Sequence, residues 1–177
     1  AGAQCVEYVL CASRGWQPDL DEIEAAGLDG VKIMMVNFPN MPTGAMPREG
    51  LFADLVAFAR RHNILLVNDN PYSFIRTERP VSLLQTPGAL DVAIELNSLS
   101  KSHNMAGWRV GAVMAHPRRI SEIIRFKSNM DSGMFRPLQL AAAEALALGD
   151  EWYEALAARY AEREVLGYRI MEALGCK

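Results

Sequence analysis

The sequence has little cysteine, no excess of basic residues and no long apolar run, and each shortage excludes a class of protein. Its 177 residues include three cysteines, Cys5, Cys11 and Cys176, which do not have metal-ligand spacing. This odd, scattered set predicts neither a disulfide framework nor a metal site, and it fits a reducing cytoplasm best. With 18 Lys+Arg against 21 Asp+Glu the formal net charge is −3, whereas nucleic acids and anionic membranes require a concentrated basic face.

The sequence also lacks segments for secretion or membrane insertion. No apolar run approaches the ~20 residues that a membrane span needs, and no basic segment followed by an apolar one marks a signal peptide. We therefore expect a cytoplasmic protein with no membrane or nucleic-acid partner. Apolar mass is present instead, since 50% of the residues are hydrophobic, which excludes a disordered chain and predicts one large core.

Short apolar runs predict the strands of a sheet. They are apolar nearly throughout, which is typical of strands covered on both faces in a parallel sheet flanked by helices. The runs are 31–36, 64–67, 92–96 and 110–115, with a weaker one at 6–10.

Residues 48–62 lie between the first two strong runs and predict a helix. Their apolar residues recur at helical spacing, and the basic end at Arg60, Arg61 and His62 suits a helix C-terminus. A strand, a helix and a strand in succession make parallel neighbours, so both strands should end at the same edge of the sheet. In open α/β sheets that edge holds the ligand.

The last predicted strand should run in the opposite direction. About a dozen residues separate Leu96 from Val110, too few for a helical crossover, so the fourth strand is expected to return antiparallel. Helices are expected after Pro117, over 118–130, 137–148 and 151–174. Because a long terminal helix often links two domains, we place a domain boundary near Gly149-Asp150.

Polar side chains follow the predicted strands at the edge where ligands bind. They lie in segments 37–44, 68–72 and 98–109, which carry a carboxylate, a phenol, a lysine, hydroxyl groups and an arginine. This set matches the needs of pyridoxal phosphate (PLP). A lysine forms a Schiff base with the cofactor aldehyde, and a carboxylate keeps the pyridine nitrogen protonated. An arginine and hydroxyl groups can bind the phosphate.

At these residues the sequence resembles the class I/II aminotransferases, which have the type I fold of PLP-dependent enzymes. The resemblance rests on a PN-x-PTG loop at 39–44, on Asp69 three residues before Tyr72, and on S-x-S-K at 98–101 followed by G-x-R-x-G at 107–111. It implies a three-layer α/β/α fold with a mostly parallel sheet and one antiparallel strand. Residues 1–149 would form part of the PLP-binding large domain, and 150–177 a long helix leading towards a small C-terminal domain.

The resemblance also implies a role for each matching residue. Lys101 would form the Schiff base and move the proton, Asp69 would pair with the pyridinium, and Tyr72 would contact the ring oxygen. Ser98, Ser100 and Arg109 would bind the phosphate. The expected activity is a ping-pong transfer of an amino group from an L-amino acid to a 2-oxo acid, carried out by a homodimer.

The sequence departs from the family pattern in two respects. Met41 stands where the family usually has an asparagine that contacts the ring oxygen, and Asn40 is one position away. The upstream phosphate loop and the downstream arginine that binds the substrate carboxylate are not present. Because the chain also lacks an initiating methionine, we expect a fragment that cannot complete an active site alone.

Other functions remain open on the same residues. Lys101 and Asp69 would serve a PLP-dependent lyase or decarboxylase equally well, or a non-catalytic aminotransferase-like domain that senses a ligand. Accumulation of a 2-oxo acid would separate an aminotransferase from a sensor. Ser98 and Lys101 also fit the S-x-x-K of penicillin-recognising serine enzymes. Those enzymes need a later K-T-G, which is absent, and a serine that opens a helix, whereas Ser98 is expected to end a strand.

Overall fold

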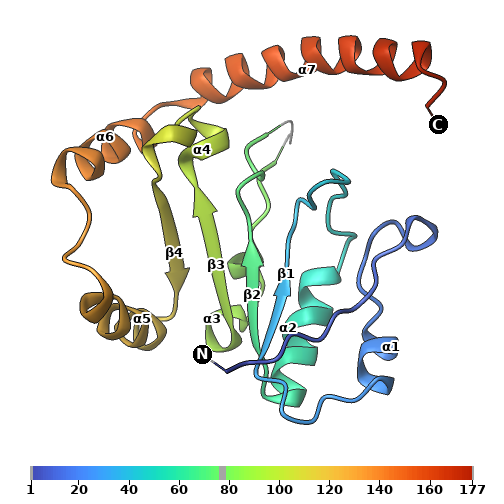
Figure 1. The fold of residues 1–177 in the computed structure, drawn as a ribbon, viewed down its shortest axis with the longest axis vertical. Coiled ribbons are helices and arrows are strands. Elements are labelled where there is room, and N and C mark those ends of the chain that lie inside the picture. The colour runs from blue at the N-terminus through green and yellow to red at the C-terminus, as the bar shows by residue number, and fades with distance from the viewer. Residues whose placement is uncertain (1, 76–78, 177) are drawn as a thin grey trace. The chain divides into compact units, whose positions relative to one another are not determined.

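The computed structural model describes residues 2–75 and 79–176 and contains an α/β fold (Figure 1). The helices are α1 (Leu20–Ala25), α2 (Leu51–His62), α3 (Ala89–Val92), α4 (Leu99–Ser102), α5 (Pro117–Met130), α6 (Arg136–Leu146) and α7 (Asp150–Ala173). The strands are β1 (Ile33–Val36), β2 (Leu65–Asp69), β3 (Ala93–Ser98) and β4 (Gly111–Ala115). Short 3-10 turns lie at Ala12–Arg14, Leu83–Gln85 and Ala106–Trp108.

The described strands form one sheet in the order β1-β2-β3-β4. β1 and β2 pair in parallel, with Ile33 opposite Leu65 and Val36 opposite Asn68. The β4 arrow points against the other arrows in Figure 1, which confirms the predicted antiparallel strand. The sheet is therefore mostly parallel. The weaker prediction of a strand at 6–10 is wrong, because this segment has no regular structure.

Helix α2 occupies most of the helix predicted at 48–62. Gly50 precedes it in the left-handed conformation, with φ 78°, and Asn63 follows it with φ 53°. Both are backbone conformations that glycine and asparagine adopt at low cost. Leu51 and Leu55 on its inner face are fully buried, so the apolar spacing in the sequence and the observed burial agree.

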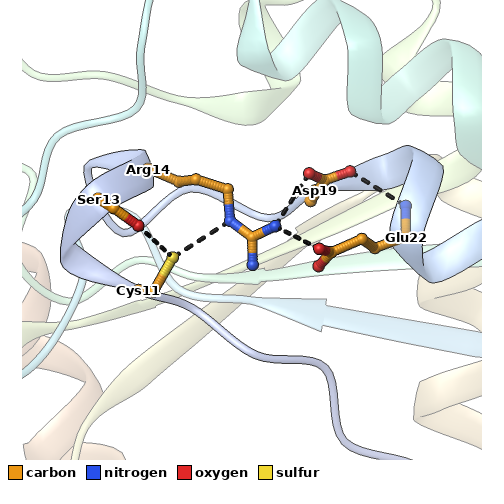
Figure 2. A network of polar contacts seen from close by, with 5 residues as sticks. All are labelled: Cys11, Ser13, Arg14, Asp19 and Glu22. Carbon is orange, nitrogen blue, oxygen red and sulfur yellow. Dashed lines mark hydrogen bonds and ion pairs between the residues drawn. The ribbon is translucent and has the colours of Figure 1, made fainter.

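Helix α1, which the sequence did not predict, is held by the polar network in Figure 2. The Asp19 carboxylate caps the helix by accepting a hydrogen bond from the Glu22 backbone N–H at 3.0 Å. Arg14 forms ion pairs with Asp19 at 3.0 Å and with Glu22 at 2.7 Å. The backbone hydrogen bond from Glu22 is the main cause that lowers the pKa of Asp19.

The chain divides into two compact units, and the first contains most of the buried apolar residues. It comprises the described residues within Ala1–Asp69, Ser82–Glu95 and Met114–His116. Its core gathers side chains from β1, α2 and β2 and from the turns before β3. The buried members are Met34, Val36, Phe38, Leu51, Leu55, Val56, Phe58, Ala59, Ile64, Leu66, Leu83, Ala89 and Ala93.

The second unit comprises the described residues within Asn70–Val81, Leu96–Val113 and Pro117–Lys177. Its buried apolar cluster is small and consists of Leu99, Met105, Val110 and Ala142. The helices predicted after Pro117 are present as α5, α6 and α7, and α7 begins at Asp150. The assignment of 1–149 and 150–177 to a large domain and a linking helix stays a prediction. Among the described residues, no helix combines the length and hydrophobicity that crossing a membrane requires.

Candidate active site

Lys101 lies on α4, a single helical turn that follows directly from β3. Ser98 is the last residue of β3 and also the N-cap of α4, where its Oγ accepts a hydrogen bond from the Ser100 N–H at 3.1 Å. The Leu99 N–H donates to the Val110 carbonyl at 3.2 Å, which joins the turn to the residue before β4. These bonds place the hydroxyl groups of Ser98 and Ser100 and the Lys101 amine on one short turn.

The side chains on this turn are available to a ligand. Lys101 is half-buried, and in the described part of the chain its amine makes no hydrogen bond or ion pair. Because Ser98 Oγ accepts from a backbone N–H, its own hydrogen remains free to donate.

The position of Ser98 corrects one argument from the sequence. The serine was expected to end a strand without opening a helix, which spoke against a penicillin-recognising enzyme. The structure has Ser98 ending β3 and capping α4 at once, so this part of the argument is wrong. The other part of the argument is unchanged, since no K-T-G occurs in these 177 residues.

Arg109 and Gly111, in the G-x-R-x-G motif, have backbone positions that set how β4 begins beside β3. Arg109 adopts the left-handed conformation, with φ 56°, and its Nη1 donates to the Ala106 carbonyl at 3.0 Å. Its other guanidinium hydrogens have no partner among the described residues. A Cβ on Gly111 would lie 2.7 Å from the Asn97 carbonyl oxygen, so β4 can pass β3 here only with a glycine.

Tyr72 follows a segment that is bonded to the strand carrying Ser98. The Asn70 N–H donates to the Leu96 carbonyl at 2.8 Å, and Asn97 Nδ2 donates to the Asn70 carbonyl at 2.9 Å. Asn70, directly after Asp69, is therefore held by Asn97, directly before Ser98. Tyr72 itself is half-buried, and its hydroxyl has no partner within the described residues.

Asp69 ends β2 in the first unit, and Asn37 fixes its backbone. Asn37 Nδ2 donates to the Asp69 carbonyl at 2.7 Å, while Asn37 Oδ1 accepts from the Met41 N–H at 2.6 Å. The Asp69 side chain is exposed and unpaired in the part of the chain described. Sequence reasoning missed Asn37, although an asparagine directly after a buried strand was a usable signal.

Met41 lies in the loop after β1, at the position where the resembling family usually has an asparagine. Met41 is 58% exposed, and its thioether makes no polar contact in the described residues. Asn40 is buried, with its Nδ2 3.4 Å from the Asn37 carbonyl and its Oδ1 accepting from the Thr43 hydroxyl at 2.6 Å. The Asn40 amide is thus used inside the loop and does not replace the usual asparagine.

A buried polar group fixes the ends of the strands in the first unit. Asn68 is fully buried, its Oδ1 accepts from the Phe38 N–H at 3.0 Å, and its Nδ2 donates to Glu95 Oε2 at 3.2 Å. Glu95, 3% exposed, also accepts from the Leu83 N–H at 2.7 Å. Buried groups satisfied in this way hold one geometry, because breaking any bond leaves a buried donor or acceptor unpaired.

The structure brings together part of the predicted site. Ser98, Ser100 and Lys101 share one turn, and Tyr72 and Arg109 belong to the same compact unit. Asp69 belongs to the first unit. Its approach to the Lys101 amine stays a prediction.

Comparisons with known proteins point to one family. The family model described as aminotransferase class I and II matches residues 1–177. The LL-diaminopimelate aminotransferase of Natranaerobius thermophilus is 42% identical over 99% of this chain and 46% of its own length. The corresponding enzyme of Aquifex aeolicus is 41% identical over the same shares.

Solved structures give the same result for the fold. Substrate-bound BacF from Bacillus subtilis superposes with a TM-score of 0.90 at 36% identity, over 95% of this chain and 43% of BacF. A probable N-succinyldiaminopimelate aminotransferase from Thermus thermophilus superposes with a TM-score of 0.82 at 30% identity, over 90% of this chain and 44% of that one. The chain spans less than half the length of these relatives.

Proposed function

The chain belongs to the class I and II aminotransferase family, and from this premise we propose that its full-length protein is a PLP-dependent aminotransferase. Residues 1–149 would be part of the large domain that binds the cofactor, and 150–177 a helix leading towards a small domain. The chain covers 46% of the length of each of two similar aminotransferases, which leaves room for a further domain in the full-length protein. The resemblance supports a homodimer, and the few scattered cysteines support a cytoplasmic location.

The residues present fit PLP by the chemistry of their donor groups. The α4 turn offers an unpaired amine and two hydroxyl groups, and Arg109 retains N–H donors beyond its bond to Ala106. A phosphate requires such hydroxyl and guanidinium donors. When bound, PLP supplies an aldehyde that a lysine amine can attack and a ring that accepts electrons from the substrate.

Each side chain would have a separate task. Lys101 Nζ would hold the cofactor covalently and then take up the proton from the substrate Cα. The Ser98 and Ser100 hydroxyls and the Arg109 guanidinium would donate hydrogen bonds to the phosphate. The Asp69 carboxylate would keep the ring nitrogen protonated, and the Tyr72 hydroxyl would donate to the ring oxygen. With Met41 in place of asparagine, no second donor to that oxygen comes from the 39–44 loop.

The unpaired Lys101 amine on the turn capped by Ser98 is the observation that carries this proposal. The test is Lys101→Ala in the full-length gene product. We expect a loss of roughly 10⁴-fold in turnover with the fold kept, because both the nucleophile and the base are removed. Lys127→Ala is the matched control, because Lys127 is an exposed lysine that pairs with Asp131 at 2.7 Å. Substantial turnover by Lys101→Ala would refute the assignment.

Product analysis separates the aminotransferase from its alternatives. An aminotransferase converts the donor to a 2-oxo acid, and a second 2-oxo acid takes the amino group with ping-pong kinetics. A lyase would release ammonia, a decarboxylase would release carbon dioxide, and a sensor would bind an amino acid without forming product. LL-diaminopimelate is the first donor to test, since the similar curated enzymes carry that name. Acidic, aromatic and sulfur-containing amino acids complete the panel.

A further inference from the structure

His103 lies two residues after Lys101 and is buried, with 6% of its surface exposed. Its Nδ1 lies 2.8 Å from Ser102 Oγ, and its Nε2 lies 3.3 Å from the Tyr153 hydroxyl of α7. A neutral imidazole has one N–H and one lone pair, and each hydroxyl group can supply the complementary role. The ring therefore bridges the end of α4 to the first turn of α7.

Aromatic contacts reinforce this bridge. The His103 ring stacks on Trp152 at 6.2 Å between centroids and meets Tyr153 edge-on at 5.7 Å. Tyr153 stacks in turn on Phe74 at 5.1 Å. The Trp152 Nε1–H also donates to the Ser102 carbonyl at 2.8 Å. Trp152 and Tyr153 of α7 thus hold Ser102 and His103 at the end of α4. Figure 1 shows α7 beginning beside α4.

The α4 turn depends on such outside support. It has only four residues, and a helix this short is not stable by itself in water. At its start, Ser98 caps the Ser100 N–H and also accepts at its carbonyl from the Ser102 hydroxyl at 3.3 Å. At its end, the His103 N–H donates to the Leu99 carbonyl at 3.2 Å. Lys101 lies between these two fixed ends.

The groups around His103 favour its neutral form. Burial lowers the pKa of His103, and a hydrogen bond to the Ala145 backbone acts in the opposite direction. The groups that contact the ring are the hydroxyls of Ser102 and Tyr153, the Trp152 indole and the Ala145 backbone, all uncharged. Burial and the nearby Asp150 charge raise the pKa of Tyr153, so this hydroxyl keeps its proton.

We propose that His103 is a positioning residue, which together with Trp152 and Tyr153 fixes the turn that presents the Lys101 amine. The inference rests on the proposed function of Lys101. The inference adds that the position of α7 affects the position of the Lys101 amine. A shift of the first turn of α7 would move Ser102 and His103, and with them Lys101. Small errors in the position of a reacting group cost roughly 100-fold in rate.

The test measures the Lys101 amine directly in the full-length apo-protein. Pyridoxal phosphate is added, the adduct is reduced with borohydride at intervals, and mass spectrometry follows the peptide containing Lys101. His103→Phe keeps the ring contacts but removes both hydrogen bonds, and we expect labelling to slow roughly 10- to 100-fold. His62→Phe is the matched control, because His62 packs against Phe58 at 4.6 Å in the first unit. Its labelling rate should stay within about twofold of wild type.

A second variant keeps the proposal testable if His103→Phe folds poorly. Trp152→Phe removes the indole N–H that holds the Ser102 carbonyl, together with part of the ring that stacks on His103. We expect slower labelling of Lys101 and faster amide hydrogen exchange over residues 99–103, with exchange in α2 unchanged. A merely structural role would raise exchange in α2 as well, and that result would overturn the inference.

The outcomes separate this inference from the function on which it rests. If the wild-type protein is not labelled at Lys101, the proposed function itself fails. If the wild-type protein is labelled and both variants are labelled at the same rate, only the positioning role of His103 is refuted.

Discussion

The two compact units differ in how they are held together. The first is packed around a continuous apolar core, in which Leu51, Leu55 and Leu66 are fully buried. The second has only a small apolar cluster around Leu99 and Met105 and relies on the hydrogen bonds and ring contacts of His103. The proposed reacting amine therefore belongs to the unit with less apolar packing. Active-site elements are often the less stable parts of a protein, because they have to move.

The exposed side chains sharpen this difference. Phe126 on α5 is 68% exposed and Phe135 before α6 is 69% exposed, while Leu156 is the buried residue of α7. Large apolar side chains left in water mark surfaces that other residues cover. We expect the second unit to gain much of its stability from contacts in the full-length protein.

Truncation of a buried leucine in each unit should give the largest difference. Leu55→Ala opens a cavity in a closed core, and we expect it to lower the free energy of unfolding by about 2–5 kcal/mol. Leu156→Ala removes the one buried side chain described on α7, and the expected loss is about 1–2 kcal/mol. Urea unfolding of both variants measures the two values. Equal losses would contradict the contrast between the units.

Two asparagines test the polar contacts of the units. Asn68→Ala leaves the buried Phe38 N–H without a partner and leaves the Glu95 carboxylate with only its bond from the Leu83 N–H, which costs roughly 2–3 kcal/mol. Asn97 is half-buried and donates one bond to the Asn70 carbonyl, so Asn97→Ala should cost about 1 kcal/mol. Thermal unfolding provides the measurement. A larger loss for Asn97→Ala would place the stronger polar anchor in the second unit.

Two serine caps should separate stability from cofactor binding. Ser98 caps α4, and Ser82 in the first unit accepts a hydrogen bond from the Leu84 N–H at 3.2 Å in the same way. Each Ser→Ala change should cost about 1 kcal/mol of stability. Only Ser98→Ala should also weaken PLP binding, by roughly tenfold, since a charge-assisted hydrogen bond to phosphate is lost. Spectrophotometric titration with PLP measures this, and equal affinities would remove Ser98 from the site.

The sequence predicted the elements that have a periodic pattern and missed those that depend on distant contacts. The apolar runs at 31–36 and 64–67 became β1 and β2, because burial on both faces leaves a local signature. The weaker run at 6–10 is also mostly apolar but pairs with no strand in the described residues. Composition alone does not supply a pairing partner.

In the candidate site, too, the sequence predicted local features and missed those that depend on distant contacts. The motif spacing of Lys101 and Arg109 could be read from the chain, because both lie on one short segment. The support from Asn37 and Trp152 could not, since their bonds span 32 and 50 positions of sequence. Helix α4 was missed because a single turn has no periodicity and is defined by its cap and its tertiary contacts.

Acid should loosen the two units in different pH ranges, and this is the smallest effect we expect. The pKa of His103 is lowered from its ordinary value of 6.5. Just below pH 6.5 this histidine is therefore protonated in the unfolded chain but still neutral in the folded chain. Stability from this group is complete above pH 6.5 and is lost as the pH falls towards the folded pKa. Asp19 in the first unit also has a lowered pKa, but its stability is present above its ordinary value of 3.8 and is lost only below it.

Amide hydrogen exchange between pH 7 and pH 5, corrected for the intrinsic pH dependence of exchange, measures this difference. The amides of residues 99–103 should lose protection over this range, whereas those of α1, capped by Asp19, should keep it. His103→Phe has no group that titrates there, so its exchange at 99–103 should become independent of pH. If that variant kept the wild-type pH dependence, another group would be responsible, and the buried imidazole would not be what makes the lysine turn sensitive to acid.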